Sequence, residues 1–218
     1  MGPALNLAAA RDAVRLALAE DIGTGDLTTG LTVDREARSR ARLVAKAAGI
    51  VAGLAVAELA FRELDADMCW QPRVQDGQPV SEGALLAEVE GLAHAILSAE
   101  RTALNFLQRM SGIATATHEM ADLVGDKATI LDTRKTAPGL RALDKYAVAV
   151  GGGRNHRFGL FDGILIKENH IRAAGGIARA VASCRHRVPL LTKIEVEVTN
   201  FDELRQALAA GADVIMLD

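Results

Sequence analysis

Cationic residues gather in one window of an otherwise slightly acidic chain. The whole chain has a formal net charge of -3, yet residues 134–172 contain eight Lys or Arg and only three Asp or Glu. Three groups in this window closely follow a short apolar run or a glycine cluster: Arg134 with Lys135, His156 with Arg157, and Lys167. Such positions gather at one rim of a parallel sheet, where fixed cations form an anion pocket. The spacing therefore predicts a site for a small, highly anionic substrate.

A second pattern places carboxylates at the same predicted rim. Residues 193–198 read KIEVEV, and in a strand Glu195 and Glu197 point to one face together with Lys193. Asp218 ends the next predicted strand and should reach the same rim. Such carboxylates can hold Mg²⁺ against a phosphorylated substrate, stabilise a developing cation, or neutralise the cationic ring. A purely structural network of ion pairs is the competing interpretation.

Composition excludes several classes of protein. The chain is 50% hydrophobic but only 3% aromatic, and a general nucleic-acid binder would need a broad basic face with stacking aromatics. Cys69 and Cys184 form no CxxC pair, so neither a disulfide framework nor a zinc site is expected. No secretion signal precedes the first helix, and the longest apolar run is too short to span a bilayer. We therefore expect a cytoplasmic protein with no membrane partner.

Periodicity predicts two kinds of architecture in succession. The first part combines a helix over 6–20, a strand over 38–46, a turn followed by an apolar helix within 49–64, and short strands within 69–90. A long helix over 93–124, which could break near Gly112, completes it. Beyond Gly125, apolar strands alternate with helices. The strands are expected at 128–133, 162–167, 193–198 and 212–217, and the helices at 139–150, 171–187 and 201–210.

This pattern predicts an α/β fold with two domains. Residues 1–115 should form a mixed α+β, sandwich-like domain, and residues 116–218 a parallel βα barrel that is incomplete in this chain. A closed eight-stranded barrel needs about 200 residues or more, roughly twice what the second domain offers.

Other motifs carry less chemistry. The stretch GGGRNH (151–156) lacks the GK[ST] ending of a P-loop, and His118 lacks the second histidine of a zincin site. Residues 69–90 superficially resemble a lipoyl or biotinyl carrier hairpin, but the hairpin has no lysine for the cofactor. Among the histidines, His156 and His170 have the neighbours that make a functional role plausible.

Several long segments together resemble one enzyme family nearly end to end. They are ALAEDIGTGDLTT (17–29), SAERTALNFLQRMSGIAT (98–115), LDTRKTAPGLRALDKYAVAVGGGRNHRFGLFDGILIKENHI (131–171), EVEV (195–198) and VIMLD (214–218). The chain is similar to quinolinate phosphoribosyltransferase, also called nicotinate-nucleotide pyrophosphorylase (carboxylating). The resemblance implies that quinolinate and phosphoribosyl pyrophosphate react, with Mg²⁺, to nicotinate mononucleotide, carbon dioxide and pyrophosphate in de novo NAD synthesis.

The resemblance also assigns residues. It implies an anion pocket formed by Arg134, Lys135, His156, Arg157 and Lys167. Thr133 is implied to supply additional polar contacts to this pocket. The resemblance further implies that Glu197 and Asp218 are the acidic pair near the ribose and the metal, and that Lys135 or Lys167 assists the departure of pyrophosphate. Arg101 matches an arginine that enters the active site from the partner subunit, which implies a homodimer.

One departure from the family leaves alternatives open. Family members continue with two more βα units, whose glycine-rich loops hold the phosphate of phosphoribosyl pyrophosphate, and with a tail that packs on the N-terminal domain. We therefore expect this chain to bind quinolinate better than phosphoribosyl pyrophosphate. The alternatives are a phosphoribosyltransferase of the same fold with another acceptor, an inactive truncated assembly module, and a generic βα-barrel phosphate binder.

Overall fold

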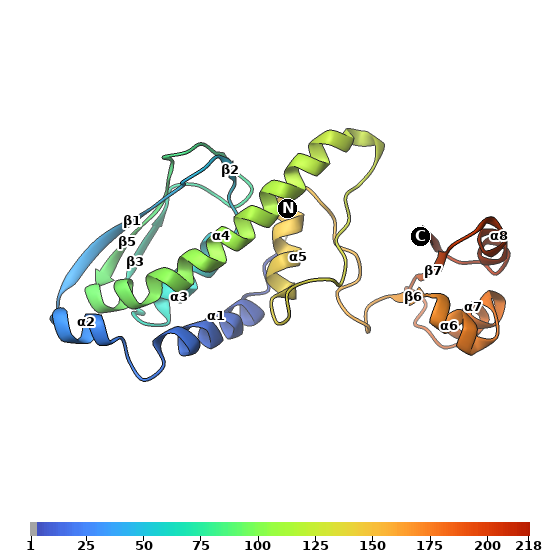
Figure 1. Cartoon of the computed structure of the whole chain (residues 1–218), viewed down its shortest axis with the longest axis horizontal. Helices are drawn as coiled ribbons and strands as arrows, with labels where there is room; N and C mark the ends of the chain where they lie inside the picture. Colours follow the sequence, from blue (N-terminus) through green and yellow to red (C-terminus); the bar gives the residue numbers. More distant parts are fainter. Residues whose placement is uncertain (1–3) are drawn as a thin grey trace. The chain divides into compact units, whose positions relative to one another are not determined.

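The computed structural model describes residues 4–218, and these divide into two compact units (Figure 1). The N-terminal unit ends at His156, and the C-terminal unit runs from Arg157 to Asp218. The domain division predicted at residue 115 falls inside α4 (Ala93–Val124), which is one continuous helix without the break considered near Gly112. As a statement about domains, that division stays a prediction.

Small antiparallel sheets form the β part of the N-terminal unit. Its main sheet has the order β1-β5-β3, made by β1 (Arg38–Val44), β5 (Leu85–Leu92) and β3 (Cys69–Pro72). β2 (Gly49–Ile50) pairs separately with β4 (Pro79–Val80). The short strands predicted between residues 69 and 90 are therefore present, and β5 buries Ala87 and Val89 completely.

Helices complete the core of this unit. They are α1 (Leu7–Ile22), α2 (Leu27–Thr32), α3 (Leu54–Arg62), α4, the short 3₁₀ turn Gly125–Lys127 and α5 (Arg141–Val150). Figure 1 shows α4 running across the sheet, with α1 beside it. The fully buried Met110 of α4 and the nearly fully buried Leu143 of α5 belong to one hydrophobic cluster with strand residues. This packing makes α5 part of the N-terminal unit.

The C-terminal unit is a parallel βα array. Its sheet has the order β6-β7-β8, with β6 (Ile164–Ile166), β7 (Ile194–Val198) and β8 (Val214–Leu217) all parallel. The helices are α6 (Glu168–Ala174), α7 (Ile177–Arg185) and α8 (Phe201–Ala209). Along β7, Ile194, Val196 and Val198 are buried while Glu195 and Glu197 are partly exposed. The predicted alternation of this strand is confirmed.

Two predicted elements are wrong in detail. Residues 128–133 form no regular strand, because they pair with the chain only through an isolated parallel bridge between Leu131 and Arg154. The helix predicted over 171–187 is interrupted by Gly175 and Gly176, whose φ angles of 79° and 129° are outside the helical range. Along residues 4–218, every helix is too short or too polar to cross a bilayer.

Candidate functional site

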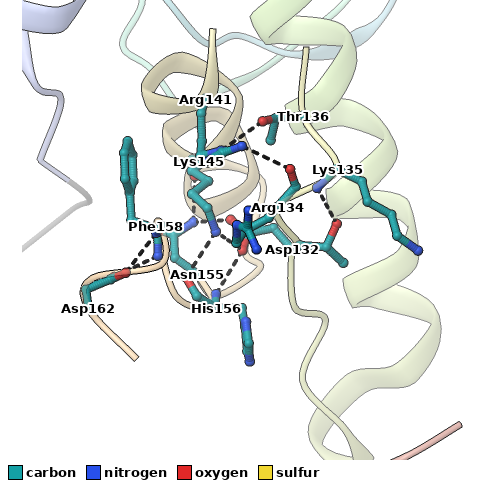
Figure 2. Close-up of polar contacts among 12 residues, drawn as sticks. Asp132, Arg134, Lys135, Thr136, Arg141, Lys145, Asn155, His156, Phe158 and Asp162 are labelled. Carbon is teal, nitrogen blue, oxygen red and sulfur yellow. Dashed lines mark hydrogen bonds and ion pairs between the residues drawn. The ribbon is translucent and has the colours of Figure 1, made fainter. Parts of the chain in front are cut away.

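The loop that carries Thr133, Arg134 and Lys135 is held by α5. The Arg141 guanidinium donates to Thr136 Oγ1 at 3.1 Å and to the Arg134 carbonyl at 3.2 Å (Figure 2). Within the loop, the Lys135 amide donates to Thr133 Oγ1 at 3.0 Å. Thr133 and Lys135 also line a cavity of about 280 Å³ in this unit. The loop is therefore anchored by side chains, since regular sheet pairing is absent here.

His156 is brought close to this loop by Asp132. The Asp132 amide donates to the Arg154 carbonyl at 3.2 Å, and the His156 amide donates to Asp132 Oδ1 at 2.8 Å. Asp132 directly precedes Thr133. Its carboxylate therefore links the two cationic segments of the N-terminal unit, residues 133–135 and residues 154–156 (Figure 2). The predicted proximity of Thr133–Lys135 and His156 is thus observed within one unit.

Two arginines carry unused hydrogen-bond donors. Among the side chains of residues 4–218, the Nε atoms of Arg134 and Arg157 are buried and have no hydrogen-bond partner. Arg157 is anchored otherwise, because its guanidinium donates to the Gly163 carbonyl at 3.1 Å within the C-terminal unit. A buried N–H group without a partner is costly and calls for an explanation. Anionic ligand groups that accept from these donors provide one.

The carboxyl ends of the C-terminal unit's strands gather the remaining predicted residues. Lys167 directly follows β6, Glu197 lies in β7, and Asp218 follows β8 with its amide donating to the Val198 carbonyl at 3.1 Å. Lys167 Nζ forms an ion pair with the Glu197 carboxylate. Of the three roles considered for the carboxylates, neutralisation of a cation is therefore seen directly at Glu197.

The acidic residues at this rim suit a weakly coordinated hard cation. Among the described residues, no group of three or more His, Cys, Asp or Glu side chains could by itself hold a metal ion. Mg²⁺ is usually bound through one or two carboxylates plus substrate phosphates and water, so it does not require such a group. Glu197 and Asp218 have the right chemistry for that mode of binding.

Arg101 and His170 stand apart from these contacts. Arg101 is exposed on α4 and has no hydrogen-bonded or ionic partner within residues 4–218. His170 has a structural task, because its Nδ1 accepts a hydrogen bond from the Lys167 amide at 3.0 Å at the start of α6. The functional role considered for His170 has no support in these contacts.

Sequence reasoning missed the residues that hold the loop. Asp132, Lys145 and Asn155 form a hydrogen-bonded cluster under Thr133 and His156. A signal was present, since Arg141, Asp144 and Lys145 have the i, i+3, i+4 spacing of one helix face. Asp144 accepts from the Ala137 amide at 3.1 Å and pairs with the Arg109 guanidinium at 2.8 Å. This pairing, followed by the Coulombic effect of the same carboxylate, raises the pKa of Arg109.

Comparisons with known proteins identify one family. Models described as quinolinate phosphoribosyl transferase, N-terminal domain and C-terminal domain match residues 26–111 and 113–218. A probable nicotinate-nucleotide pyrophosphorylase [carboxylating] of Bacillus subtilis is 50% identical over 200 residues, covering 91% of this chain and 69% of that protein. Quinolinate phosphoribosyltransferase [decarboxylating] 1b of Nicotiana tabacum is 48% identical, covering 94% of this chain and 61% of that protein.

Solved structures lead to the same family. The crystal structure of NadC from Streptococcus pyogenes matches with a TM-score of 0.94 at 41% identity, covering 100% of this chain and 77% of that one. The nicotinate-nucleotide pyrophosphorylase from Francisella tularensis matches with a TM-score of 0.93 at 45% identity, covering 99% and 76%. The chain spans only about three fifths of the length of the plant relative named above. The residues, the fold and these relatives together show that the chain belongs to the quinolinate phosphoribosyltransferase family.

Proposed function

We propose that the chain transfers the phosphoribosyl group of phosphoribosyl pyrophosphate to quinolinate with decarboxylation, giving nicotinate mononucleotide, carbon dioxide and pyrophosphate for NAD synthesis. The observation that carries this proposal is the pair of buried, unpartnered Nε donors on Arg134 and Arg157. Relatives with 48–50% identity are named for this activity.

The charge of quinolinate explains why such donors are needed. Its two adjacent carboxylates repel one another, and fixed guanidinium groups offset that repulsion while binding each carboxylate through a planar fork. In the proposal, Arg134 and Arg157 receive the carboxylates, and Thr133, Lys135, His156 and Lys167 complete the anion pocket. The Arg157 guanidinium is already held by the Gly163 carbonyl, so it loses little entropy when the ligand arrives.

The acidic residues serve the ribose in this proposal. Breaking the ribose–pyrophosphate bond creates oxocarbenium character, which the carboxylates of Glu197 and Asp218 stabilise electrostatically. Lys135 and Lys167 offset the charge of the departing pyrophosphate. Mg²⁺ bound through Glu197 and Asp218 would supply further charge neutralisation on the phosphate oxygens. The Lys167–Glu197 ion pair would have to open or share its charge as substrates bind.

Decarboxylation follows transfer in this scheme. Loss of the carboxylate beside the ring nitrogen as carbon dioxide leaves carbanion character on the ring carbon, which then takes up a proton from water to give nicotinate mononucleotide. Ribosylation first makes that nitrogen cationic, and the cation stabilises the adjacent negative charge. The dense cationic pocket also favours a dicarboxylate over the alternative acceptors that share this fold.

We further propose a cytoplasmic homodimer in which Arg101 reaches the site of the partner subunit. The exposure of Arg101, with no partner within the described residues, supports a role that its own subunit does not satisfy. An assembly module without catalysis would use the same dimer surface, so ligand binding separates that alternative from the enzyme.

The direct test is calorimetry of quinolinate binding to the full chain. Arg134→Ala and Arg157→Ala should each weaken binding by about 2–5 kcal/mol, because each removes one side of a buried charged hydrogen bond. Arg172→Ala is the matched control, since Arg172 belongs to the same cationic window but is exposed and paired with Glu168 on its own helix.

The outcomes discriminate among the candidate functions. Binding of quinolinate but not of the monocarboxylate nicotinate, lost in both pocket variants and kept in Arg172→Ala, would support the proposal. Equal affinity for both acids would favour the same fold with another acceptor. No binding, in a chain that circular dichroism shows to be folded, would favour the assembly module. An assay for nicotinate mononucleotide with phosphoribosyl pyrophosphate and Mg²⁺ then tests the transfer itself.

A further inference from the structure

Lys145 of α5 is a cation that the proposed chemistry does not use. Only 3% of the residue is exposed, and although Lys145 lines the same cavity as Thr133 and Lys135, its ammonium group is engaged by acceptors of the protein. Its Nζ lies 2.5 Å from Asp132 Oδ1 and 3.0 Å from the carbonyl oxygen of His156. Figure 2 shows the lysine reaching from the helix to both segments. A single ammonium group thus contacts Asp132, just before the segment 133–135, and His156, at the end of the segment 154–156.

Asp132 is the second centre of this cluster. Its Oδ1 accepts from Lys145 Nζ and from the His156 amide at 2.8 Å, and its Oδ2 accepts from Asn155 Nδ2 at 2.6 Å. Asn155 Nδ2 also donates to the carbonyl of Lys145 at 2.8 Å, which closes the ring of contacts. The side chains of Asp132 and Lys145 are 6% and 4% exposed, so water competes little for these bonds.

Regular backbone pairing cannot fix the two segments here. They share one isolated bridge, Leu131 with Arg154, and two backbone hydrogen bonds at its sides. Beside that bridge, side-chain bonds of Asp132, Lys145 and Asn155 join residue 132 to residues 155–156. The ion pair therefore helps to hold the two segments together, as backbone hydrogen bonds hold β7 and β8 together.

A buried ion pair is an unusual choice if stability is its only purpose. Replacing both partners by neutral groups of similar volume is often harmless to stability, whereas removing one partner leaves an uncompensated charge. What the pair supplies here is a fixed spacing between Thr133–Lys135 and His156. Anion pockets need such spacing, because small displacements of the donors weaken binding strongly.

We propose that Lys145 is a positioning residue for quinolinate binding, acting through Asp132 and the His156 carbonyl without touching the ligand. This inference rests on the proposed function and adds to it a residue outside the anion pocket. In this proposal Lys145 fixes the positions of Thr133, Arg134 and His156. The exposed Asn155 stabilises the cluster through its hydrogen bonds to Asp132 and to the Lys145 carbonyl.

The test replaces both charges at once. Lys145→Met alone would leave Asp132 buried and unpaired and could unfold the chain, so the main variant combines Lys145→Met with Asp132→Asn. Asn155→Ala is a second variant at an exposed position, where loss of folding is not expected. Tyr146→Phe is the matched control, because it removes a hydrogen bond of 2.8 Å to Asp76 from the neighbouring residue of the same helix.

Two readouts are measured on the full chain: the dissociation constant of quinolinate, and amide hydrogen exchange of residues 132–136 and 154–157. The double variant should keep the unfolding midpoint of the parent while its dissociation constant rises at least tenfold and both segments exchange faster. Asn155→Ala should change both readouts in the same direction by a smaller factor. Tyr146→Phe should leave both unchanged even where it lowers the unfolding midpoint.

The failures are distinguishable. A parent chain that binds no quinolinate overturns the proposed function and the ligand-binding part of this inference with it. A parent that binds, with the double variant and Asn155→Ala both within twofold of its affinity, overturns the role of Lys145 alone. Unchanged hydrogen exchange in Asn155→Ala and in the double variant would show that the cluster does not position the segments, whatever the ligand.

Discussion

A single carboxylate, Asp213, ties together the starts of two strands and a helix of the C-terminal unit. Its Oδ2 accepts from the Ile194 amide at 2.7 Å and pairs with the Arg185 guanidinium at 2.9 Å. The backbone hydrogen bond from Ile194, followed by the bond from Arg185, lowers the pKa of Asp213 below its usual value. The ionised carboxylate is therefore the form that the fold prefers.

This shift predicts how stability responds to acid. A depressed pKa in the folded state contributes stability above the pKa of the unfolded chain, and that contribution is lost as pH falls through the folded value. Asp213→Asn should lower the unfolding free energy at neutral pH and flatten its decline below about pH 4. Urea unfolding at a series of pH values, followed by a probe in the C-terminal unit, measures this free energy. Asp202→Asn, at an exposed carboxylate paired with Arg205 on its own helix, should leave the acid slope unchanged. An acid slope in Asp213→Asn equal to the parent's would contradict the argument.

At the scale of residues, the sequence indicated which cationic residues belong to the candidate site. It did not indicate which of them are paired inside the fold. Arg134 and Arg157 could be singled out because each stands beside a strand-like run or a glycine cluster. Lys145 could not be separated from them, because its neutralising partner Asp132 lies 13 residues away in the chain and becomes adjacent only through the turn before α5. Burial and pairing depend on that tertiary contact, which charge patterns do not contain.

At the scale of elements, strands with alternating apolar residues were the most predictable. β7 has both a period of two and neighbours on each side, so its pattern and its burial agree. Residues 128–133 have a similar apolar run but only one bridge partner, and apolar character alone does not make a strand. The helix predicted over 171–187 was divided because two adjacent glycines adopt φ angles that a helix does not allow.

The glycine cluster 151–153 has structural reasons of its own. A Cβ on Gly151 would lie 2.3 Å from the Ala114 carbonyl and 2.8 Å from Thr117 Cβ, so α5 ends in direct contact with the backbone of α4. Gly152 has a φ of 95°, which other residues rarely adopt. The cluster thus lets the chain turn tightly against α4 before it reaches Asn155 and His156.

Gly151→Ala should destabilise the N-terminal unit by about 1–3 kcal/mol, because the added methyl group overpacks the contact with α4. Gly112→Ala is the matched control inside α4, where an added Cβ meets nothing within 4 Å. This control should stabilise the chain by about 0.5–1 kcal/mol, since alanine favours a helix interior over glycine. Urea unfolding of both variants measures the difference. Equal effects at the two positions would show that the close approach at Gly151 has no energetic weight.

At the scale of the whole molecule, the candidate residues divide between the two units. The N-terminal unit holds Arg101, the loop 133–135 and His156, and the C-terminal unit holds Arg157, Lys167, Glu197 and Asp218. The sheet of the C-terminal unit ends at β8, where Leu217 is 75% exposed, and Phe201 of α8 is 76% exposed. Parallel sheets are normally covered on both faces and paired along their edges. Leu217 and Phe201 are therefore large apolar groups that this unit by itself leaves exposed.

The proposed homodimer makes a prediction that a single chain cannot satisfy. If Arg101 serves the partner's site, Arg101→Ala and Arg134→Ala disable the same site from opposite subunits. Mixing the two variants under conditions of subunit exchange should restore quinolinate binding to about a quarter of the sites, because half of the dimers become mixed and each has one intact site. Calorimetric stoichiometry before and after exchange measures the recovery. Arg101→Ala mixed with itself should recover nothing, which excludes refolding as the cause. An absence of recovery, with sedimentation showing that exchange took place, would return Arg101 to its own subunit and remove the shared site from the proposal.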